Sequence, residues 1–383
     1  MPKHGLRAVL VIGLASALTA AFCQGVGISG GSVAYGAIIA ALIVRPDFSR
    51  WPVLLYPVLL IVVAGCMAIG VSLGLALAGV PQVLLVGMVA ALMQLLTLLL
   101  PQKLRLLSGV MAVTGVLPLL GGSPSWSNWG SEVLAIAFGL AIGTLLQKVF
   151  TPPSRSNPAA GSEGQGEQPP PAVAPSEAAE PSLSSRLRQG LHSPFFWRKL
   201  VFASLALAIG QGVGAVTPKY LYFGVVLLLN DSIGSTLIRV RDRMVGVSLG
   251  VLMPLLVFNC LGMNELSTGL VMAGTAALVM ALRCEAHLNT ALISSGVAFI
   301  GYGPLVAWYI PNRWIDYLMG CGLALVVGLV LFPSSALRRF NQCRENPDSS
   351  AKELIALLPA AREEARWLGL PEPELPPMPR SIA

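Results

Sequence analysis

The sequence predicts an all-α polytopic membrane protein, with about twelve transmembrane helices arranged as two parallel six-helix repeats joined by a disordered cytoplasmic linker. Of its 383 residues, 55% are hydrophobic and only 11% are charged, whereas a soluble domain carries about 25% charged residues. The mean hydropathy is +0.73. Apolar runs explain this composition, and a polar interval separates them into two groups: 8–28, 32–44, 52–78, 82–100, 106–121 and 131–149, then 200–216, 220–230, 244–261, 266–282, 288–308 and 314–332.

Short motifs recur in the same order in the two groups of runs, which indicates an internal duplication. The first motif is followed eight residues later by a tyrosine in both halves, Tyr35 and Tyr222. The matching motifs are Cys23-Gln-Gly-Val-Gly27 with Gly210-Gln-Gly-Val-Gly214, Gly70-Val-Ser-Leu-Gly74 with Gly246-Val-Ser-Leu-Gly250, and Gly139-Leu-Ala with Gly322-Leu-Ala. An even number of helices in each half makes the repeats parallel in the membrane.

The chain therefore divides into a first membrane repeat, a linker, a second membrane repeat and a tail: 1–150, 151–196, 197–335 and 336–383. The linker is rich in Pro, Gly, Ser, Ala and Glu. It is predicted to be disordered because it cannot bury a core. Residues 348–370 of the tail predict one short helix, which could lie on the membrane or on the inner face of the protein.

Lysine and arginine residues set the predicted orientation. Starting the N-terminus inside leaves only Lys219 and Arg313 of the loop cations outside, and cytoplasmic loops carry the excess of such residues. We therefore expect a multi-pass protein of the inner or plasma membrane with both termini in the cytoplasm. The basic start and the run 8–23 resemble a signal peptide, but the same segment recurs at 201–216, so we read it as retained.

Several classes of function and site are not expected. The net charge of +7 is explained by basic residues facing one compartment, and no arginine-rich, aromatic-interleaved groove predicts nucleic-acid binding. The six cysteines form no Cys-x-x-Cys pair and the three histidines are far apart, so we expect neither a metal site nor a disulfide framework. We expect no cofactor and no enzymatic activity, because no acid/base cluster is visible.

Glycine-broken segments at matching places in the two halves predict a transport path. The two helices between 200 and 229 share about 30 residues, or about 45 Å, whereas two crossings of the bilayer core need about 60 Å. Such interruptions in both halves are a sequence-level indication of a transporter's binding site. The candidate substrate-path residues beside them are Gln24, Tyr35, Gln211, Tyr220 and Tyr222. Alternatively, the glutamines bond across helices and the tyrosines lie in the interfacial belt.

A charged cluster, Arg239, Arg241, Asp242 and Arg243, precedes the run 244–261. Charges are costly inside a bilayer, so the cluster marks a membrane surface. It is either a positive-inside anchor or part of the substrate path at an inward vestibule. Arg243 is the arginine expected to face the interior.

Other small and charged residues have expected structural roles. Small residues four apart, at Gly70 and Gly74 and again at Gly246 and Gly250, predict close helix packing. Glu285 and His287 could relay protons, since histidine titrates near a pH of about 6.5, or could cap a cytoplasmic turn. Glu132 and Asp316 are expected at the N-termini of the sixth and twelfth helices, where their carboxylates would accept hydrogen bonds from the free backbone N–H groups.

The arrangement resembles the fusaric acid resistance-like (aromatic acid exporter) membrane family. The resemblance rests on two six-helix groups and on Arg243-Met-Val-Gly-Val-Ser-Leu-Gly250 opening the third helix of a half. It is best over 200–333 and weaker over 5–150, where the glycine motif persists without the arginine. It implies an inner-membrane exporter of aromatic carboxylates and related weak acids, with a periplasmic adaptor in some members. Many members also carry a folded cytoplasmic domain between the halves, which the linker replaces here.

Two other readings remain open. A major-facilitator-like carrier also has two parallel six-helix halves, but in Asp242-Arg-Met-Val-Gly246 the glycine of its loop signature comes one place late and no basic pair follows. A non-transporting membrane scaffold or assembly factor could use the linker and tail to recruit partners. The expected partners are a small anionic substrate, the lipid bilayer, and either an adaptor protein or a second copy of the chain.

Overall fold

The computed structural model describes residues 3–44, 55–99, 108–120, 124–150, 188, 191, 194–214, 219–228, 232–302, 306–326, 335–345 and 351–375. Within these ranges the regular secondary structure is entirely helical, which confirms the predicted all-α class. The predicted linker, 151–196, lies almost wholly outside the described residues.

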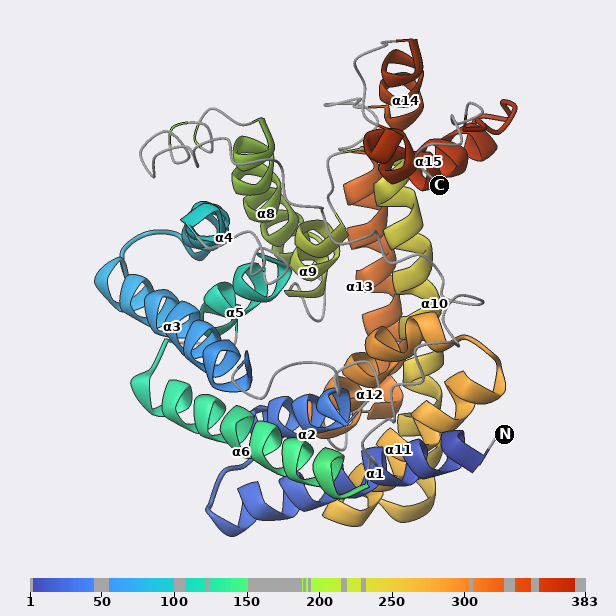
Figure 1. Ribbon diagram of the computed structural model, residues 1–383. Helices are drawn as coiled ribbons and strands as arrows, with labels where there is room; N and C mark the ends of the chain where they lie inside the picture. The colour runs from blue at the N-terminus through green and yellow to red at the C-terminus, as the bar shows by residue number, and fades with distance from the viewer. Residues whose placement is uncertain are drawn as a thin grey trace. The chain divides into compact units, whose positions relative to one another are not determined.

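One helix lies at each predicted apolar run (Figure 1). The first six are α1 (Lys3–Gly25), α2 (Gly31–Ile43), α3 (Leu55–Ala76), α4 (Gln82–Leu99), α5 (Ser108–Leu120) and α6 (Trp126–Phe150). The next six are α8 (Pro194–Gly212), α9 (Lys219–Leu228), α10 (Ile233–Leu261), α11 (Glu265–Ala281), α12 (Leu288–Tyr302) and α13 (Val306–Val326). The tail adds α14 (Ala336–Glu345) and α15 (Ala351–Trp367).

Four of these helices are long and apolar enough to cross a membrane by length and composition: α1, α3, α6 and α10. Several of the others are apolar but have only 10 to 17 residues in their apolar segments, among them α2, α11 and the apolar part of α13. The chain is therefore a multi-pass membrane protein.

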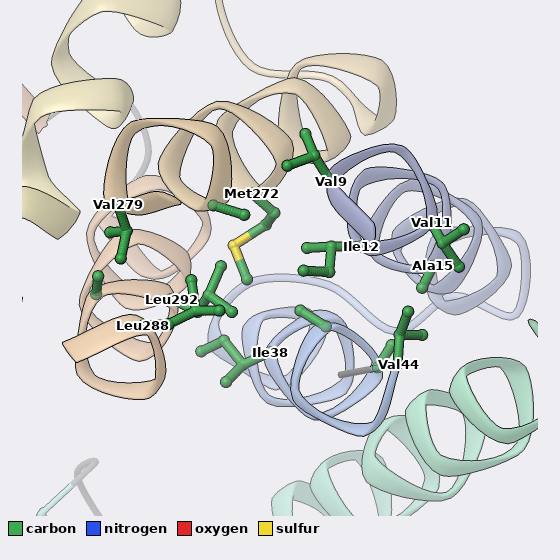
Figure 2. Close-up of a cluster of buried hydrophobic side chains, with 14 of the residues drawn as sticks. Val9, Val11, Ile12, Ala15, Ile38, Val44, Met272, Val279, Leu288 and Leu292 are labelled. Carbon is green, nitrogen blue, oxygen red and sulfur yellow. The ribbon is translucent and has the colours of Figure 1, made fainter. Parts of the chain in front are cut away.

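The chain forms two compact units, the first made of residues 1–164 and 243–315. Its core joins α1, α2, α11 and α12. Figure 2 shows Ile12 of α1, Ile38 of α2 and Met272 of α11 converging with Leu292 of α12. Lipid is as apolar as these side chains, so close van der Waals packing rather than exclusion from water holds such helices together.

Glycines allow the closest helix contacts of the first unit. Gly70 of α3 lies against the backbone of Gly115 in α5, and Gly74 lies against Leu119 of the same helix. The later part of α10 makes the same kind of contact, with Gly250 against Ala291 of α12. One turn earlier, a Cβ added at Gly246 would lie 2.5 Å from the Cβ of Thr290. A larger residue at Gly70 or Gly250 would push two backbones apart, and one at Gly74 or Gly246 would displace a neighbouring side chain.

The second unit comprises residues 165–242 and 316–383. Its membrane part packs α8, α9 and α13 around Phe202, Leu221 and Val225, with Gly224 of α9 directly against Gly320 of α13. The tail forms a helical hairpin, α14–α15, around Phe340, Leu354 and Ala361 (Figure 1).

Several helix starts differ from the predictions, and three of them concern charged residues. Helix α10 begins at Ile233, well before the predicted apolar run 244–261, so Arg239, Arg241 and Asp242 lie inside the helix together with Arg243. Helices α6 and α13 begin at Trp126 and Val306, so the prediction that Glu132 and Asp316 open them is wrong, and neither helix has an acidic residue in its first turn. At α6, the hydroxyl oxygen of Ser125 accepts a hydrogen bond from the Ser127 N–H at 3.2 Å and starts the helix earlier.

The tail also differs from the prediction of one short helix over 348–370. Helix α15 occupies Ala351–Trp367 within that range, and α14 precedes it over Ala336–Glu345. The strongly amphipathic pattern of α14 has its buried face at Ala336 and Phe340, which are four residues apart.

Candidate functional site

Two glycine turns with the same geometry interrupt the chain at matching places in the two halves. Helix α1 ends at Gly25 and is followed by Gly27, whose φ is 84°; α8 ends at Gly212 and is followed by Gly214, whose φ is 65°. In the first turn the Gly27 N–H donates to the Gln24 carbonyl at 2.9 Å, and in the second the Gly214 N–H donates to the Gln211 carbonyl at 3.2 Å. The glycine turns that the sequence predicted are therefore present, one after α1 and one after α8.

Alanine at Gly27 or Gly214 is expected to destabilise the protein by about 1–2 kcal/mol, because a residue with a Cβ pays that cost in the left-handed region. Gly25 and Gly212 are matched controls, since each lies in a helix with no atom near its missing Cβ. Alanine there is expected to be neutral or slightly stabilising. The measurement is the thermal unfolding midpoint in detergent. Equal shifts at the turn and control positions would contradict the structural role of the turns.

The helices that follow the two turns are too short to cross a bilayer. Helix α2 has 13 residues and α9 has 10, or about 20 Å and 15 Å at 1.5 Å per residue, against a core of about 30 Å. Backbone groups at their ends therefore need partners inside the protein, in water or on a ligand. Helix N-termini of this kind attract anions.

The predicted substrate-path residues beside the turns lie in different environments. Gln24 and Gln211 are exposed at the ends of α1 and α8. Tyr35 is half-buried and packs on the cluster formed by α3 and α6. Tyr222 is completely buried in α9. The side chain of Tyr220 lies outside the described residues. In this conformation the glutamines are accessible, whereas Tyr222 belongs to the core.

The arginine cluster lies near one end of α10. Residues 244–261, which follow it, span about 27 Å at 1.5 Å per residue, which is close to the thickness of a bilayer core. The cluster therefore falls at the end of this apolar span. Arg239 and Arg243 are four residues apart and share one face of the helix, whereas Arg241 points elsewhere.

The members of the cluster differ in exposure and in their partners. Arg239 and Arg241 are exposed, and Asp242 is half-buried. Arg243 is half-buried, with its Nε atom fully covered. The Arg241 Nε lies 3.6 Å from an Asp242 carboxylate oxygen, and Arg241 also pairs with Glu363 of α15 at 3.3 Å. The structure thus brings together Arg241, Asp242 and a tail residue that the sequence did not predict.

Glu285 and His287 form a 3₁₀ turn, η3 (Glu285–His287), between α11 and α12. Glu285 is exposed and His287 is partly exposed. The His287 N–H donates to the Cys284 carbonyl at 2.9 Å, and the His287 carbonyl oxygen lies beside Gly246 of α10. These contacts place both residues in the connection between two helices.

A groove between α3 and α6 was not predicted. It has a volume of about 410 Å³, within the usual range for ligand pockets. Its walls are mostly apolar, with polar groups from Tyr56, Thr144 and Lys148. The Tyr56 hydroxyl donates to the Gln147 side-chain oxygen at 3.4 Å. The sequence separates the two walls by about 80 residues, so only the fold reveals the groove.

The described residues contain no group of three or more His, Cys, Asp or Glu side chains placed to hold a metal ion. All six cysteines are free thiols. At the end of α15, the hydrogen bond from Arg366 to Glu372 raises the pKa of that guanidinium.

Comparison with known proteins finds one similarity, which lies in the second half of the chain. Residues 205–327 match the family model described as fusaric acid resistance protein-like. No match was found among curated proteins or among solved structures. The matched range runs from α8 through α13 and includes the arginine cluster of α10, and it confirms the resemblance expected from the motif at Arg243 to Gly250. Residues 205–327 of this multi-pass membrane protein are therefore similar to the fusaric acid resistance protein-like family.

Proposed function

We propose that this chain is a transporter of the inner or plasma membrane that exports aromatic carboxylates or other small weak-acid anions. The observation that carries the proposal is the arginine cluster of α10, at the end of an apolar span inside the region that matches the fusaric acid resistance protein-like family. Guanidinium groups bind carboxylates through charge-assisted hydrogen bonds, and cations at a mouth raise the local concentration of anions. The substrate would cross the membrane without chemical change.

The proposed architecture is about twelve membrane helices in two parallel repeats, in which the short helices α2 and α9 cover only part of the bilayer. Equivalent contacts in the two halves support it. The glycine motif of the third helix packs on the fifth helix in both halves: Gly70 contacts Gly115 and Gly74 contacts Leu119, while Gly246 contacts Thr290 and Gly250 contacts Ala291.

A second set of contacts also repeats. The first, second and sixth helices of the first half share a cluster that includes Cys23, Val33 and Ala135, and α8, α9 and α13 share a cluster in the second half. A duplicated unit would produce this correspondence.

In this proposal both termini lie in the cytoplasm, and the arginine cluster of α10 and each of the two glycine turns are candidate substrate contacts. The short helices α2 and α9 leave backbone N–H groups that can meet an anion within the membrane. Gln24 and Gln211 extend from the last turns of α1 and α8, where their amides could donate to a carboxylate. The aromatic ring of a substrate would stack on a tyrosine or arginine side chain among these candidate contacts.

The main competing proposal is a non-transporting scaffold, for which the folded α14–α15 hairpin would be a docking module. The major-facilitator reading has less support, because the segment that would hold its signature lies inside the fusaric acid resistance protein-like match. A periplasmic adaptor or a second copy of the chain remains the proposed protein partner of the exporter.

Accumulation of radiolabelled aromatic acids tests the proposal. Cells that express the protein are expected to accumulate less benzoate, or less of another acid in a panel of aromatic and aliphatic weak acids, than cells that lack it. Benzyl alcohol, which has the ring without the carboxylate, is the control and should accumulate equally. No difference for any acid in the panel would reject export and favour the scaffold.

A further inference from the structure

The tail hairpin is a folded module with its own internal contacts. Phe340 of α14 packs with Leu354 and Ala361 of α15. A carboxylate oxygen of Glu364 accepts hydrogen bonds from the Ala336 N–H at 2.7 Å and the Leu337 N–H at 3.3 Å. Glu364 therefore caps the first turn of α14 and ties the two helices together.

The hairpin docks on the first turns of α10 through a contact that only glycine permits. Gly234 of α10 lies against the backbone of Ala360 in α15, and a Cβ at position 234 would overlap the Ala360 carbonyl. Ala360 itself is 7% exposed. Two helices that approach this closely are held in a defined register.

That register brings the neighbouring glutamate, Glu363, to Arg241. The Arg241 Nη1 lies 3.3 Å from both carboxylate oxygens of Glu363. The Glu363 side chain is only 11% exposed, whereas the Arg241 side chain is 55% exposed. Arg366 approaches the same carboxylate at 3.5 Å. The guanidinium of Arg241 thus contacts two carboxylates, those of Glu363 and Asp242, and its side chain is still more than half exposed to solvent.

We infer that Arg241 is a carboxylate-binding site at the inner mouth and that Glu363 occupies it when the hairpin is docked. A carboxylate substrate and the hairpin then compete for one guanidinium, so the tail restrains the transporter until substrate accumulates. The identity of the competing substrate rests on the proposed function; the occupancy of Arg241 by Glu363 does not. An ion pair with one partner this exposed is weak enough for a solute to displace.

Docking can be measured without transport. In a variant lacking the natural cysteines, Ala360→Cys places a thiol at the contact with Gly234, and its reaction with a maleimide reports release of the hairpin. We expect Glu363→Gln to raise the labelling rate about two- to five-fold, the factor associated with an exposed ion pair. Glu372→Gln is the matched control, because Glu372 pairs with Arg366 and lies in no contact with Arg241, and it should leave the rate unchanged.

Benzoate then tests the competition. It is expected to raise the labelling rate when Glu363 and Arg241 are both present, and to have no effect with Arg241→Gln. Benzyl alcohol should have no effect on any variant. Equal labelling of the Glu363→Gln and Glu372→Gln variants, or labelling that benzoate does not change, would overturn the proposal.

An export assay distinguishes a failure of this proposal from a failure of the proposed function. Glu363→Gln, Gly234→Leu and a chain ending at residue 335 are expected to lower the apparent KM for benzoate export, since each removes the competing carboxylate. If labelling responds as predicted but no variant exports any acid, the proposed export function is wrong, whereas the occupancy of Arg241 by Glu363 is supported. If the wild-type chain exports benzoate but releasing the hairpin leaves the KM unchanged, the competition is wrong.

Discussion

Leucine at position 70 is expected to abolish the accumulation of folded protein, whereas leucine at position 65 of the same helix leaves it unchanged. A Cβ at Gly70 would overlap the Gly115 carbonyl of α5, while no atom lies within 4 Å of a Cβ at Gly65. Overpacking commonly costs about 1–3 kcal/mol, and more where backbones must separate. Replacing glycine by leucine raises the helix propensity by about 1 kcal/mol in both variants. The difference between the two variants therefore measures the cost of overpacking at Gly70.

The second half offers an independent pair for the same experiment. Gly320 of α13 lies directly against Gly224 of α9, whereas Gly322, two residues later, has no atom near its missing Cβ. The measurement is the monodisperse fraction of a fluorescent fusion on size exclusion in mild detergent. Loss of that fraction is expected for Gly70→Leu and Gly320→Leu alone. Equal behaviour of the two members of a pair would show that these glycines do not set the helix contacts.

Alanine at position 243 is expected to abolish export of weak acids without reducing the amount of protein in the membrane. Arg243 is the half-buried arginine of the cluster, and the apolar span that follows it is unchanged by the substitution. Lysine at this position keeps the charge but loses the planar fork that holds a carboxylate by two hydrogen bonds. Arg243→Lys is therefore expected to export at an intermediate rate. The measurement is the efflux of radiolabelled benzoate from preloaded cells, normalised to membrane protein.

The control for this prediction is Arg339→Ala. Arg339 is exposed on α14, so its removal takes away one cytoplasmic positive charge without touching α10. It should export like the wild-type chain. Normal export by Arg243→Ala at a normal protein level would show that the arginine only anchors the helix at the membrane surface.

The sequence predicted the positions of the helices better than their ends. Apolar runs located each membrane helix because hydropathy follows burial in lipid, but the first turns of α10 are polar and were missed. Ser232 gave the signal for that helix start: its hydroxyl accepts a hydrogen bond from the Ser235 N–H at 3.3 Å. Ser125 has the same role at α6. Serines ahead of polar turns thus mark helix starts that hydropathy alone misses.

The candidate site was only partly predictable. The glycines at 27 and 214 identified the two turns because a positive φ favours glycine. Nothing in the order of residues indicated which of two adjacent glutamates, Glu363 or Glu364, would face α10. That choice depends on the rotation of α15 against its neighbours. The groove between α3 and α6 likewise depends on tertiary packing alone.

Counterflow in liposomes tests the central claim, that arginines at one end of a duplicated helical bundle admit carboxylates for transport. The purified protein is reconstituted into vesicles loaded with unlabelled benzoate, and uptake of labelled benzoate is followed without any ion gradient. Transient uptake above protein-free vesicles is expected for the wild-type chain and not for Arg243→Ala. Uptake that is equal in all three preparations, for benzoate and for every other weak acid tested, would contradict the account.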